Sequence, residues 1–492
     1  AWRGVTLDVP GALLLLAGCS TVPEPVTEQT MVTLIEDDRA LIVEQRLPVS
    51  GAISQSEAIA RALKFNLDHR VTLLEQAYAT AWFEAGRYDL LPQVLANAGY
   101  STRDEEAIRD SIDSVTGAPS LSNPSISSER ERATANLGLT WSLLDFGVGY
   151  YNARQNANAL LIASERRRQA MYHLIERVRA TYWKAAAAQV LAARVRDTQA
   201  LAEQALTRSR SLSSGGVTNP VQSLRYQRNL LENLRLLESV QRELAQGSIE
   251  LASLMGLDPG TAFELSVPTG LNVEWQDLPL GELEVRALVS NPDLRAQVYN
   301  TRNAALETRR AMLGMFPNLS FDTTLRYDDD RYLINNQWQE AGARIGFNLL
   351  GLLSTPARMR ASEASLHIEE ARRMALQMAV LTQLHMAYND YGDAIREYRR
   401  AVMIAEVDAA LGDIAIGQEA SRMSGRLERI SADVSVILST LRQYRALARV
   451  HEQSSRVHAL IGSGPEIDSV DTLSVSALSA LIEPLVDEWP LP

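Results

Sequence analysis

The sequence predicts a mainly α-helical protein that also carries membrane β-strands. Ala, Leu, Arg, Gln and Glu dominate long stretches, and only 6% of the residues are aromatic, a composition typical of long helices. The stretch 150–214 contains no Gly and no Pro, so it predicts a helix far longer than an ordinary globular domain contains. Four shorter segments alternate between apolar and polar residues with the period of two that β-strands have.

The bulk composition argues against several classes of protein. Of the 492 residues, 46% are hydrophobic, which is too many for a disordered chain. The net charge is −12, and because phosphate binding needs a positive surface, we expect no nucleic-acid partner. Cys19 is the only cysteine, so neither an intrachain disulfide nor a cysteine-based metal cluster can form.

The N-terminal segment has the pattern of a bacterial export signal. Its apolar run over 11–18 is too short to span a bilayer as a helix but suits the core of a signal peptide. Leu16-Ala-Gly-Cys19 resembles a lipobox, in which the cysteine sulfur carries a diacylglycerol, and Ser20 resembles an outer-membrane sorting signal. A chance match in an ordinary signal peptide is the alternative. No other segment suits a transmembrane helix, so strands or the lipid would provide any membrane contact.

The chain carries a duplicated pattern, which two internal alignments reveal. The first alignment shifts the chain so that Asn66 matches Asn291. The second uses a shorter shift, which matches Gly256 with Gly462. The difference between the two shifts predicts an insertion near 102–132 in the first half, and the Ser, Asp, Glu, Pro and Gly content there is typical of a surface loop.

Long helices are expected in both halves. At 1.5 Å per residue, a continuous helix over 150–214 would be about 95 Å long, which indicates a coiled coil or a helical tube. Apolar residues recur at steps of three and four, and polar residues cover the other faces, as in helices that pack sideways with water on their remaining sides. The clearest rows are Met171, Leu174, Val178 and Tyr182 in the first half and Leu376, Val380 and Leu384 in the second.

The four alternating segments, 94–101, 133–143, 319–328 and 341–348, approach the length of a tilted membrane strand. Opposite their apolar face lie Asp322, Arg326 and Arg344, and these charges suit a water-filled barrel lumen better than a soluble sandwich. Four strands leave two open edges, where unpaired N–H and C=O groups are costly in lipid. Because the smallest membrane barrels need about eight strands, the chain must oligomerise if these strands enter a bilayer.

The order of these features is similar to that of the TolC-like outer-membrane factors over about 53–462. It comprises the lipobox, two strand–helix halves, Trp141-Ser-Leu-Leu-Asp-Phe-Gly147 before a very long helix, and the turn Gly215-Gly-Val-Thr-Asn-Pro220. The resemblance implies a homotrimer whose shared twelve-stranded β-barrel, four strands per chain, continues into a long α-helical barrel. It further implies a lipid-anchored protein of the bacterial outer membrane that extends into the periplasm. Its implied partners are the bilayer, through barrel and acyl chains, a periplasmic adaptor protein and an inner-membrane efflux pump.

By the same resemblance, two helical hairpins point towards the pump, with turns near 212–221 and 416–427. Gly215, Gly216 and Gly425 would provide the backbone freedom to reverse the chain. In a trimer each charged residue of the second turn appears three times around one axis, so a carboxylate ring would bind cations and ion pairs would hold a closed gate. The candidates are Asp408, Asp413, Glu419, Arg422 and Arg426; ordinary solvated charges of a coiled coil are the alternative.

No pattern of a catalytic, metal or cofactor site is apparent. The turn Gly-Val-Thr-Asn-Pro lacks the Lys and the spacing of a P-loop, and the six His residues show no HExxH spacing. His451 and His458 lie seven positions apart, which favours a surface pair over a metal site. No nucleophile, base and oxyanion site come together, so we expect no catalytic residue, no metal and no cofactor.

These patterns predict six segments and one leading function. The segments are a signal peptide with lipobox (1–19), an extended N-terminal tether with little helix (20–52), a first strand–helix repeat (53–262), a linker (263–279), a second repeat (280–462) and a C-terminal tail that packs around the waist (463–492). The leading hypothesis is the outer-membrane channel of a tripartite efflux pump, a passive exit duct for small molecules such as drugs or metal ions. The alternatives are the exit channel of a type I protein secretion system and a soluble periplasmic coiled-coil scaffold.

Overall fold

A computed structural model describes the residues 24–44, 47–110, 112–120, 123–214, 220–267, 279–421, 425–465, 467, 470 and 472–487. The chain divides into two compact units, Ala1–Val49 and Ser50–Pro492. In the first unit, helix α2 (Glu28–Glu44) corrects our expectation of an extended tether with little helix. The prolines that suggested a tether, Pro25 and Pro48 among the described residues, lie outside the helix and therefore do not interrupt its hydrogen bonds.

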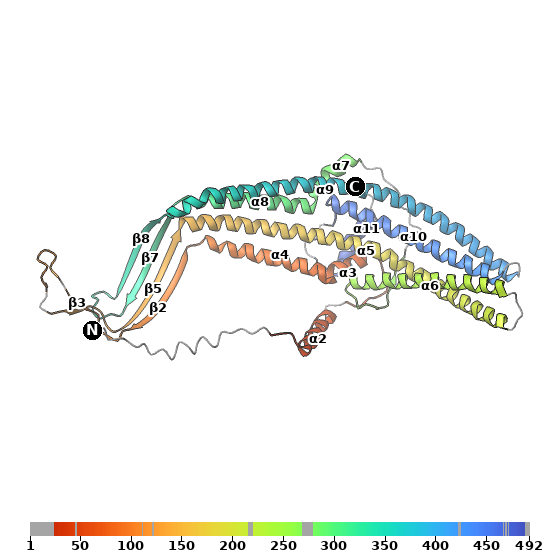
Figure 1. Cartoon of the computed structure of the whole chain (residues 1–492), viewed down its shortest axis with the longest axis horizontal. Coiled ribbons are helices and arrows are strands. Elements are labelled where there is room, and N and C mark those ends of the chain that lie inside the picture. Colours follow the sequence, from red (N-terminus) through yellow and green to blue (C-terminus); the bar gives the residue numbers. More distant parts are fainter. Residues whose placement is uncertain are drawn as a thin grey trace. The chain divides into compact units, whose positions relative to one another are not determined.

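An antiparallel four-stranded sheet lies at one end of the helices of the second unit (Figure 1). Its strands are β2 (Gln93–Thr102), β5 (Glu131–Ser142), β7 (Asn318–Asp328) and β8 (Gln337–Gly346), in the order β2-β5-β7-β8. All four alternating segments of the sequence therefore form strands. Within the described chain, β2 and β8 are paired on one side only, so each leaves a row of backbone N–H and C=O groups open.

Two pairs of antiparallel helices extend from the sheet. The long members, α5 (Leu143–Ser214) and α9 (Leu349–Ala420), have 72 residues each. The returning members, α6 (Pro220–Leu254) and α10 (Arg426–Leu460), have 35 residues each. The chain thus reverses within the two expected turn regions, which confirms both predicted hairpins. We call α5 with α6 the first hairpin and α9 with α10 the second hairpin.

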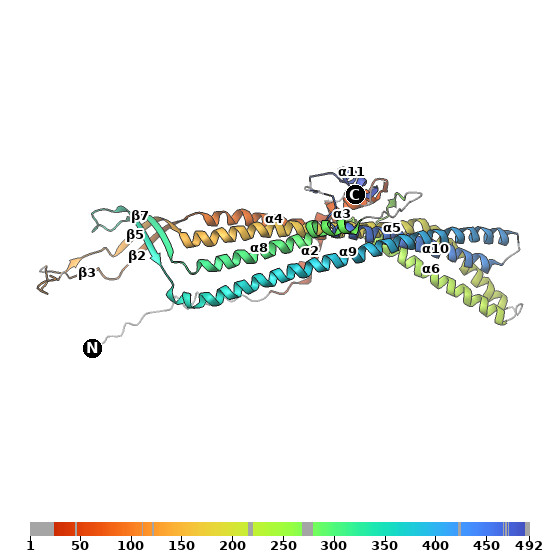
Figure 2. The ribbon, with the colours of Figure 1, turned by 90° about the horizontal axis from the view of Figure 1, so that it is seen from above.

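Between the sheet and the middle of the long helices, four helices form a single layer (Figure 2). Two shorter helices, α4 (Leu67–Gly86) and α8 (Pro292–Leu313), complete this layer. The packing order is α4-α5-α8-α9, so α4 and α9 are its edges. Helix α4 leads through the short helix η1 (Tyr88–Leu90) into β2, and β8 leads directly into α9. Each edge helix of the layer is therefore continuous in the chain with an edge strand of the sheet.

The duplicated sequence pattern is also a duplicated structure. The shift that carries Gly256 onto Gly462 also carries the bounds of α5 and α6 onto those of α9 and α10. The longer shift, which carries Asn66 onto Asn291, carries α3 (Gln55–Phe65) onto α7 (Leu280–Ser290) and the starts of α4 and β2 onto those of α8 and β7. These two asparagines play one role: they cap α4 and α8 by accepting hydrogen bonds from the backbone N–H groups of His69 (3.0 Å) and Leu294 (3.1 Å).

The remaining elements surround the middle of the long helices or lie beyond the sheet. The strand β1 (Ala52–Ile53) pairs in parallel with β6 (Glu264–Leu265). Helix α11 (Val475–Asp487) of the tail packs on α3, where Leu478 and Ile482 are buried. Within the expected loop insertion near 102–132, β3 (Ile108–Arg109) and β4 (Ser125–Ile126) form a small hairpin. One hydrophobic core joins both hairpins through α5, α6 and α10, and it includes Leu191, Leu230, Leu237, Ile430, Ile437 and Leu441.

Two aligned glycines fix the ends of the returning helices. Gly256 and Gly462 have φ values of +72° and +65°, which side chains rarely adopt. An added Cβ would lie 2.6 Å from the Cβ of Phe65 at Gly256, and 2.3 Å from the carbonyl oxygen of Ser290 at Gly462. Both contacts are with the last residue of a short helix, α3 or α7, so the repeat extends to this detail.

We predict that Gly256→Ala and Gly462→Ala each destabilise the protein by more than about 1 kcal/mol, because each combines backbone strain with a steric clash. Thermal unfolding followed by circular dichroism would measure the loss. Gly281→Ala is the matched control, since an added Cβ there meets no atom within 4 Å and the backbone has no positive φ. Equal melting temperatures for Gly462→Ala and Gly281→Ala would contradict the prediction.

Candidate functional site

The sheet has one polar and one apolar face, as the alternation predicts. In the observed register Arg326 lies opposite Trp338, Asp322 opposite Gly342 and Arg344 opposite Ser320. Because directly opposed residues share a face and residues alternate along a strand, Asp322, Arg326 and Arg344 all lie on the polar face. The other face is apolar and includes Leu137, Leu139, Trp141, Phe321, Leu325, Tyr327 and Ile345.

The polar face holds two functional candidates that the sequence analysis missed. Glu340 forms an ion pair with Arg326, with 3.0 Å between Oε2 and Nε. The indole Nε1 of Trp338 donates a hydrogen bond to the Oε1 of the same carboxylate at 2.8 Å. Both residues were missed because the last strand was expected to begin at 341, whereas β8 begins at Gln337. Their alternation with Gly342 and Arg344 was the signal that could have extended the strand.

The unpaired charges of this face lie close to the backbone. An added Cβ at Gly342 would lie 3.1 Å from both carboxylate oxygens of Asp322. The carboxylate of β7 therefore lies over β8 at a position that has no side chain. Neither Asp322 nor Arg344 has an ion-pair partner among the residues that the structure describes. Charges without partners need water, which supports a wet environment on this face of the sheet.

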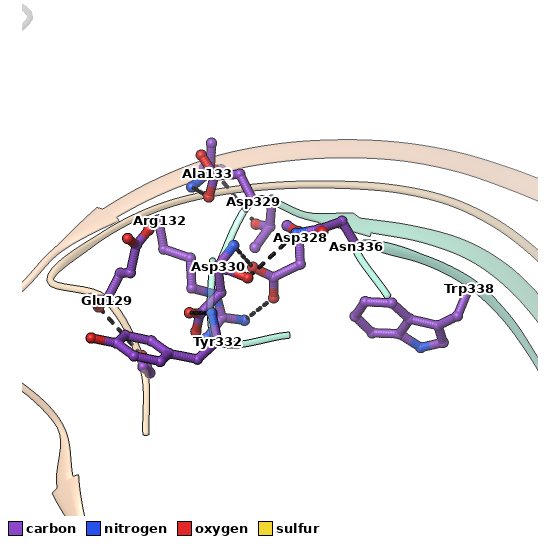
Figure 3. A network of polar contacts seen from close by, with 12 residues as sticks. Glu129, Arg132, Ala133, Asp328, Asp329, Asp330, Tyr332, Asn336 and Trp338 are labelled. Atoms are coloured by element: carbon purple, nitrogen blue, oxygen red, sulfur yellow. Dashed lines mark hydrogen bonds and ion pairs between the residues drawn. The ribbon is translucent and has the colours of Figure 1, made fainter. Parts of the chain in front are cut away.

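At the end of the sheet away from the helices, a polar network fixes the loop between β7 and β8 (Figure 3). Arg132 and Asp328 form an ion pair of 2.6 Å between β5 and β7, although Asp328 is only 4% exposed. The backbone N–H of Ala133 donates to Asp329 Oδ1 at 2.7 Å, and the amide of Asn336 donates to the carbonyl of Asp328 at 2.7 Å. The loop is therefore held against β5 by charge-assisted bonds, which are stronger than neutral ones.

The turn of the second hairpin contains a set of ion pairs that crosses three helices. Glu419 of α9 accepts hydrogen bonds from Arg429 (2.6 Å) and Arg426 (3.2 Å) of α10. The bond from Arg429, followed by the one from Arg426, lowers the pKa of the Glu419 carboxyl below its usual value. Arg429 also lies 3.8 Å from the buried Asp433, which forms an ion pair of 3.0 Å with Arg194 of α5. The two hairpins are thus joined by charge.

A glycine on α9 makes room for this connection. At Gly412, an added Cβ would lie 2.9 Å from the Cγ2 of Val436 and 3.5 Å from the Nη2 of Arg194. Any larger residue at 412 would therefore displace α10 or the guanidinium. The sequence analysis missed Arg194 and Asp433, since a pairing between residues so far apart in the chain leaves no local pattern.

The predicted gate residues have different environments. Glu419 and Arg426 are paired with each other, whereas the half-buried Asp408 and the exposed Asp413 have no ion-pair partner in the described part of the chain. Gly425 precedes α10 with φ of −86°, which any residue adopts, so our expectation that its backbone freedom is required there is wrong. Arg422, Gly215, Gly216 and the lipidation candidate Cys19 lie outside the described residues.

The two histidines expected as an exposed surface pair are covered by other helices, His458 fully and His451 in part. His458 is 6% exposed, and the ring of His451 stacks on Trp183 with 5.3 Å between ring centroids. The Nη2 of Arg179 donates to His451 Nδ1 at 2.9 Å, so the ring is a neutral acceptor in this arrangement. Burial, and secondly the charge of Arg179, hold the pKa of His451 well below its usual value. The surface prediction failed because α10 is covered by α5 on this side.

Two further features are absent from the residues that the structure describes. Within the described ranges, no group of three or more His, Cys, Asp or Glu side chains is arranged to hold a metal ion. Among the helices described here, none combines the length and apolarity that crossing a membrane requires.

Comparison with known proteins shows what the chain is similar to. Residues 58–257 match the family model described as outer membrane efflux protein. Together with the fold of the solved structures below, this match indicates an outer-membrane efflux channel that lies in the outer membrane. No curated protein sequence matches the chain.

Solved structures of outer-membrane channels share the fold of this chain. The channel OprN is 20% identical, with a TM-score of 0.63 over 83% of this chain and 90% of that one. CmeC of Campylobacter jejuni is 11% identical, with a TM-score of 0.65 over 87% and 89% of the two chains. MtrE of Neisseria gonorrhoeae is 16% identical, with a TM-score of 0.61 over 85% and 94%. The predicted fold class, a strand barrel continuing into a helical barrel, is confirmed.

We predict that acid destabilises this efflux protein partly through His451. Below about pH 6.5 the unfolded chain binds a proton at this histidine, whereas the folded protein, with its lowered pKa, does not. The free energy of unfolding therefore decreases as the pH is lowered below about 6.5. Above that pH, His451 is neutral in both the folded and the unfolded state and has no effect on the pH dependence. His451→Asn keeps an acceptor for Arg179 but does not titrate, so its acid-unfolding midpoint, measured by circular dichroism, should lie at lower pH than that of the unsubstituted protein. A midpoint that does not move would contradict this.

Proposed function

We propose that the chain is the exit duct of a tripartite efflux pump and that three copies close it. The observation that carries this proposal is that the sheet and the helix layer of one chain are both open on the same two sides. One side is formed by β2 and α4 and the other by β8 and α9. The two sides differ, so copies that join one side to the other form a closed ring. Three copies provide the twelve strands that the family resemblance implies.

The polar face of the sheet would line the lumen and the apolar face would contact lipid. Along β5, the apolar face runs from Ala133 to Trp141, eight steps of about 3.3 Å. With the tilt of about 40° that strands of outer-membrane barrels have, this face covers about 20 Å of bilayer, most of their apolar band of about 25 Å. Asp322, Arg326, Glu340 and Arg344 would then line the water-filled pore, three copies of each.

At the opposite end, the helix tips would meet the adaptor protein and the inner-membrane pump. A cavity of about 490 Å³ lies between the ends of α5 and α6, and its lining includes Arg208, Leu212, Tyr226 and Arg426 of the tip region. A groove of this kind suits a helical hairpin of the adaptor. Lipidation of Cys19 would add a second attachment to the membrane, since each buried CH₂ of an acyl chain contributes about 0.8 kcal/mol.

The ion pairs at the tips would keep the duct closed when it is not engaged. The Arg194–Asp433 pair ties the second hairpin to the first, and the Glu419 pairs tie α9 to α10. Asp408 and Asp413 lie on the same helix and have no ion-pair partner among the described residues. Three copies of either around one axis would form a ring that attracts cations. We propose that opening breaks the Arg194–Asp433 pair and moves the second hairpin away from α5.

Small-molecule efflux is favoured over the two alternatives. The strands with one polar and one apolar face, together with the match to the outer membrane efflux protein model, argue against a soluble scaffold. An exit channel for secreted proteins would have the same fold, and cargo separates the two: efflux of small molecules should be lost on deletion of the gene, whereas secretion of a protein substrate should not.

We predict that the purified protein conducts ions in planar bilayers and that Arg194→Gln raises its conductance or open probability severalfold, because the variant loses the charge that joins the hairpins. Arg235→Gln is the control, since the ion pair of Arg235 among the described residues is an exposed one of 3.0 Å with Glu232 on its own helix. An absence of channels in both the unsubstituted protein and Arg194→Gln would refute the duct. Equal conductance of Arg194→Gln and Arg235→Gln would refute only the proposal that the Arg194–Asp433 pair keeps the duct closed.

We also predict that Asp408→Asn or Asp413→Asn changes the block of this conductance by divalent cations. A ring of three carboxylates concentrates cations at the narrowest point, and neutral amides would remove that attraction. Single-channel recordings with Mg²⁺ added on the helical side would measure the block. If conductance and block are unchanged in the double variant, these residues do not form the aperture.

A further inference from the structure

Helix α4 carries a row of large apolar side chains that the single chain leaves exposed. Tyr78 and Trp82 pack edge to face with 6.2 Å between their ring centroids, and both are more than half exposed. The row recurs at steps of three and four residues, so it occupies one face of the helix. It consists of Leu67, Val71, Leu74, Tyr78 and Trp82. Large exposed apolar rows of this kind mark interaction surfaces.

The opposite edge of the layer, α9, carries a row of mostly small side chains at the same spacing. Four of its six members are alanines, and all six are exposed in the single chain. The row is Ala361, Ala364, Ile368, Ala371, Ala375 and Met378. Large side chains on one edge and small ones on the other are the complement that close helix packing needs. The two edge helices also run in opposite directions, because α4 leads into the sheet and α9 leads out of it.

The internal repeat supplies the register between these rows. Within the chain, α5 packs against α8. Helix α9 is the equivalent of α5 by the shorter shift, and α4 is the equivalent of α8 by the longer one. In a ring of repeated units, the contact between α5 and α8 inside one chain therefore has its counterpart between α9 of one copy and α4 of the next. Each observed contact of the first kind predicts one of the second.

The predicted contacts place the large residues over the small ones. Asn158 donates to Asn303 at 2.7 Å inside the chain, and the equivalent pair between copies is Ala364 with Tyr78. Gln155 donates to Glu307 at 3.2 Å, and its equivalent pair is Ala361 with Trp82. The polar contacts within the chain thus become contacts of an aromatic ring with an alanine between copies. Neither row was needed to obtain this register, so their fit supports it independently.

The strands give a register by the same pair of shifts. Leu137 of β5 lies opposite Leu325 of β7 inside the chain. The equivalent pair between copies is Ala343 of β8 opposite Tyr100 of β2. A large residue again faces a small one, and the open backbone groups of both edge strands become paired.

We propose that this apolar seam is the docking surface for a second copy of the chain: α4 and β2 of one copy bind α9 and β8 of the next, with Tyr78 and Trp82 over Ala364 and Ala361. The proposal rests on the proposed function and adds the register and chemistry of the contact. The seam between copies is dry and depends on shape, whereas the seam within each chain is polar. The chain can therefore fold with its internal seam complete before the seam between copies forms.

Paired cysteines test the register in the full-length protein in detergent. Tyr78→Cys with Ala364→Cys should form interchain disulfides under mild oxidation, seen as a ladder of multimers on non-reducing gels. The control pair, Tyr78→Cys with Ala371→Cys, is shifted by two helical turns, about 10 Å, and should cross-link at least tenfold less. Each single substitution leaves Cys19 as the only other cysteine and should give no ladder. Efficient cross-linking of the shifted pair, or none by either, would overturn the proposal.

A bulky substitution in the row of small side chains on α9 provides a second test that does not need a disulfide. Ala364→Trp should reduce the multimeric fraction on size exclusion at least tenfold while the helical circular dichroism signal is kept, because Ala364 is exposed in the single chain. Glu363→Trp adds the same bulk one position earlier, off the row, and should assemble normally. Normal assembly of Ala364→Trp would overturn the proposal. If the unsubstituted protein forms no multimer, the proposed function fails; if it forms one without the expected cross-link, only this register fails.

Discussion

The backbone groups at the two edges of the sheet are the constraint on which the rest of the structure depends. In the described chain β2 and β8 are each paired on one side only, and an unpaired N–H or C=O group costs several kcal/mol in hydrocarbon. A twisted sheet of four strands is too narrow to close on itself. In the proposed assembly another copy pairs these open edges. The edge helices follow the edge strands because β2 continues from α4 and β8 continues into α9.

Charge in this molecule is placed where water is expected or where a partner neutralises it. Asp322 and Arg344 lie on the face that would line the pore, whereas Asp433 is buried and bound by arginines from two helices. Arg179 is buried against a neutral histidine in the middle of the helices. The internal repeat allows two seams of the same geometry to differ in chemistry. The polar seam within the chain tolerates water before assembly, whereas the proposed apolar seam between copies would gain free energy only when water leaves it.

Local patterns in the sequence were sufficient for the elements but not for their neighbours. The strands, the long helices and the hairpin turns were predictable because each depends on residues close in the chain. The burial of His458 and the Arg194–Asp433 pair were not, since they depend on which helix covers which face. Helix α2 was missed because prolines flanking a segment were taken as a property of the whole segment. Glu340 and Trp338 were missed through a strand boundary placed too late, and boundaries carry little local signal.

The number of chains in the detergent-solubilised protein tests the central claim most directly. Native mass spectrometry of the full-length protein, released from its detergent micelle, counts the copies without any substitution. The account predicts a single species of three chains that loses solubility when detergent is removed. A stable, water-soluble single chain with its sheet intact would contradict it, since the open edges of β2 and β8 would then need no other copy.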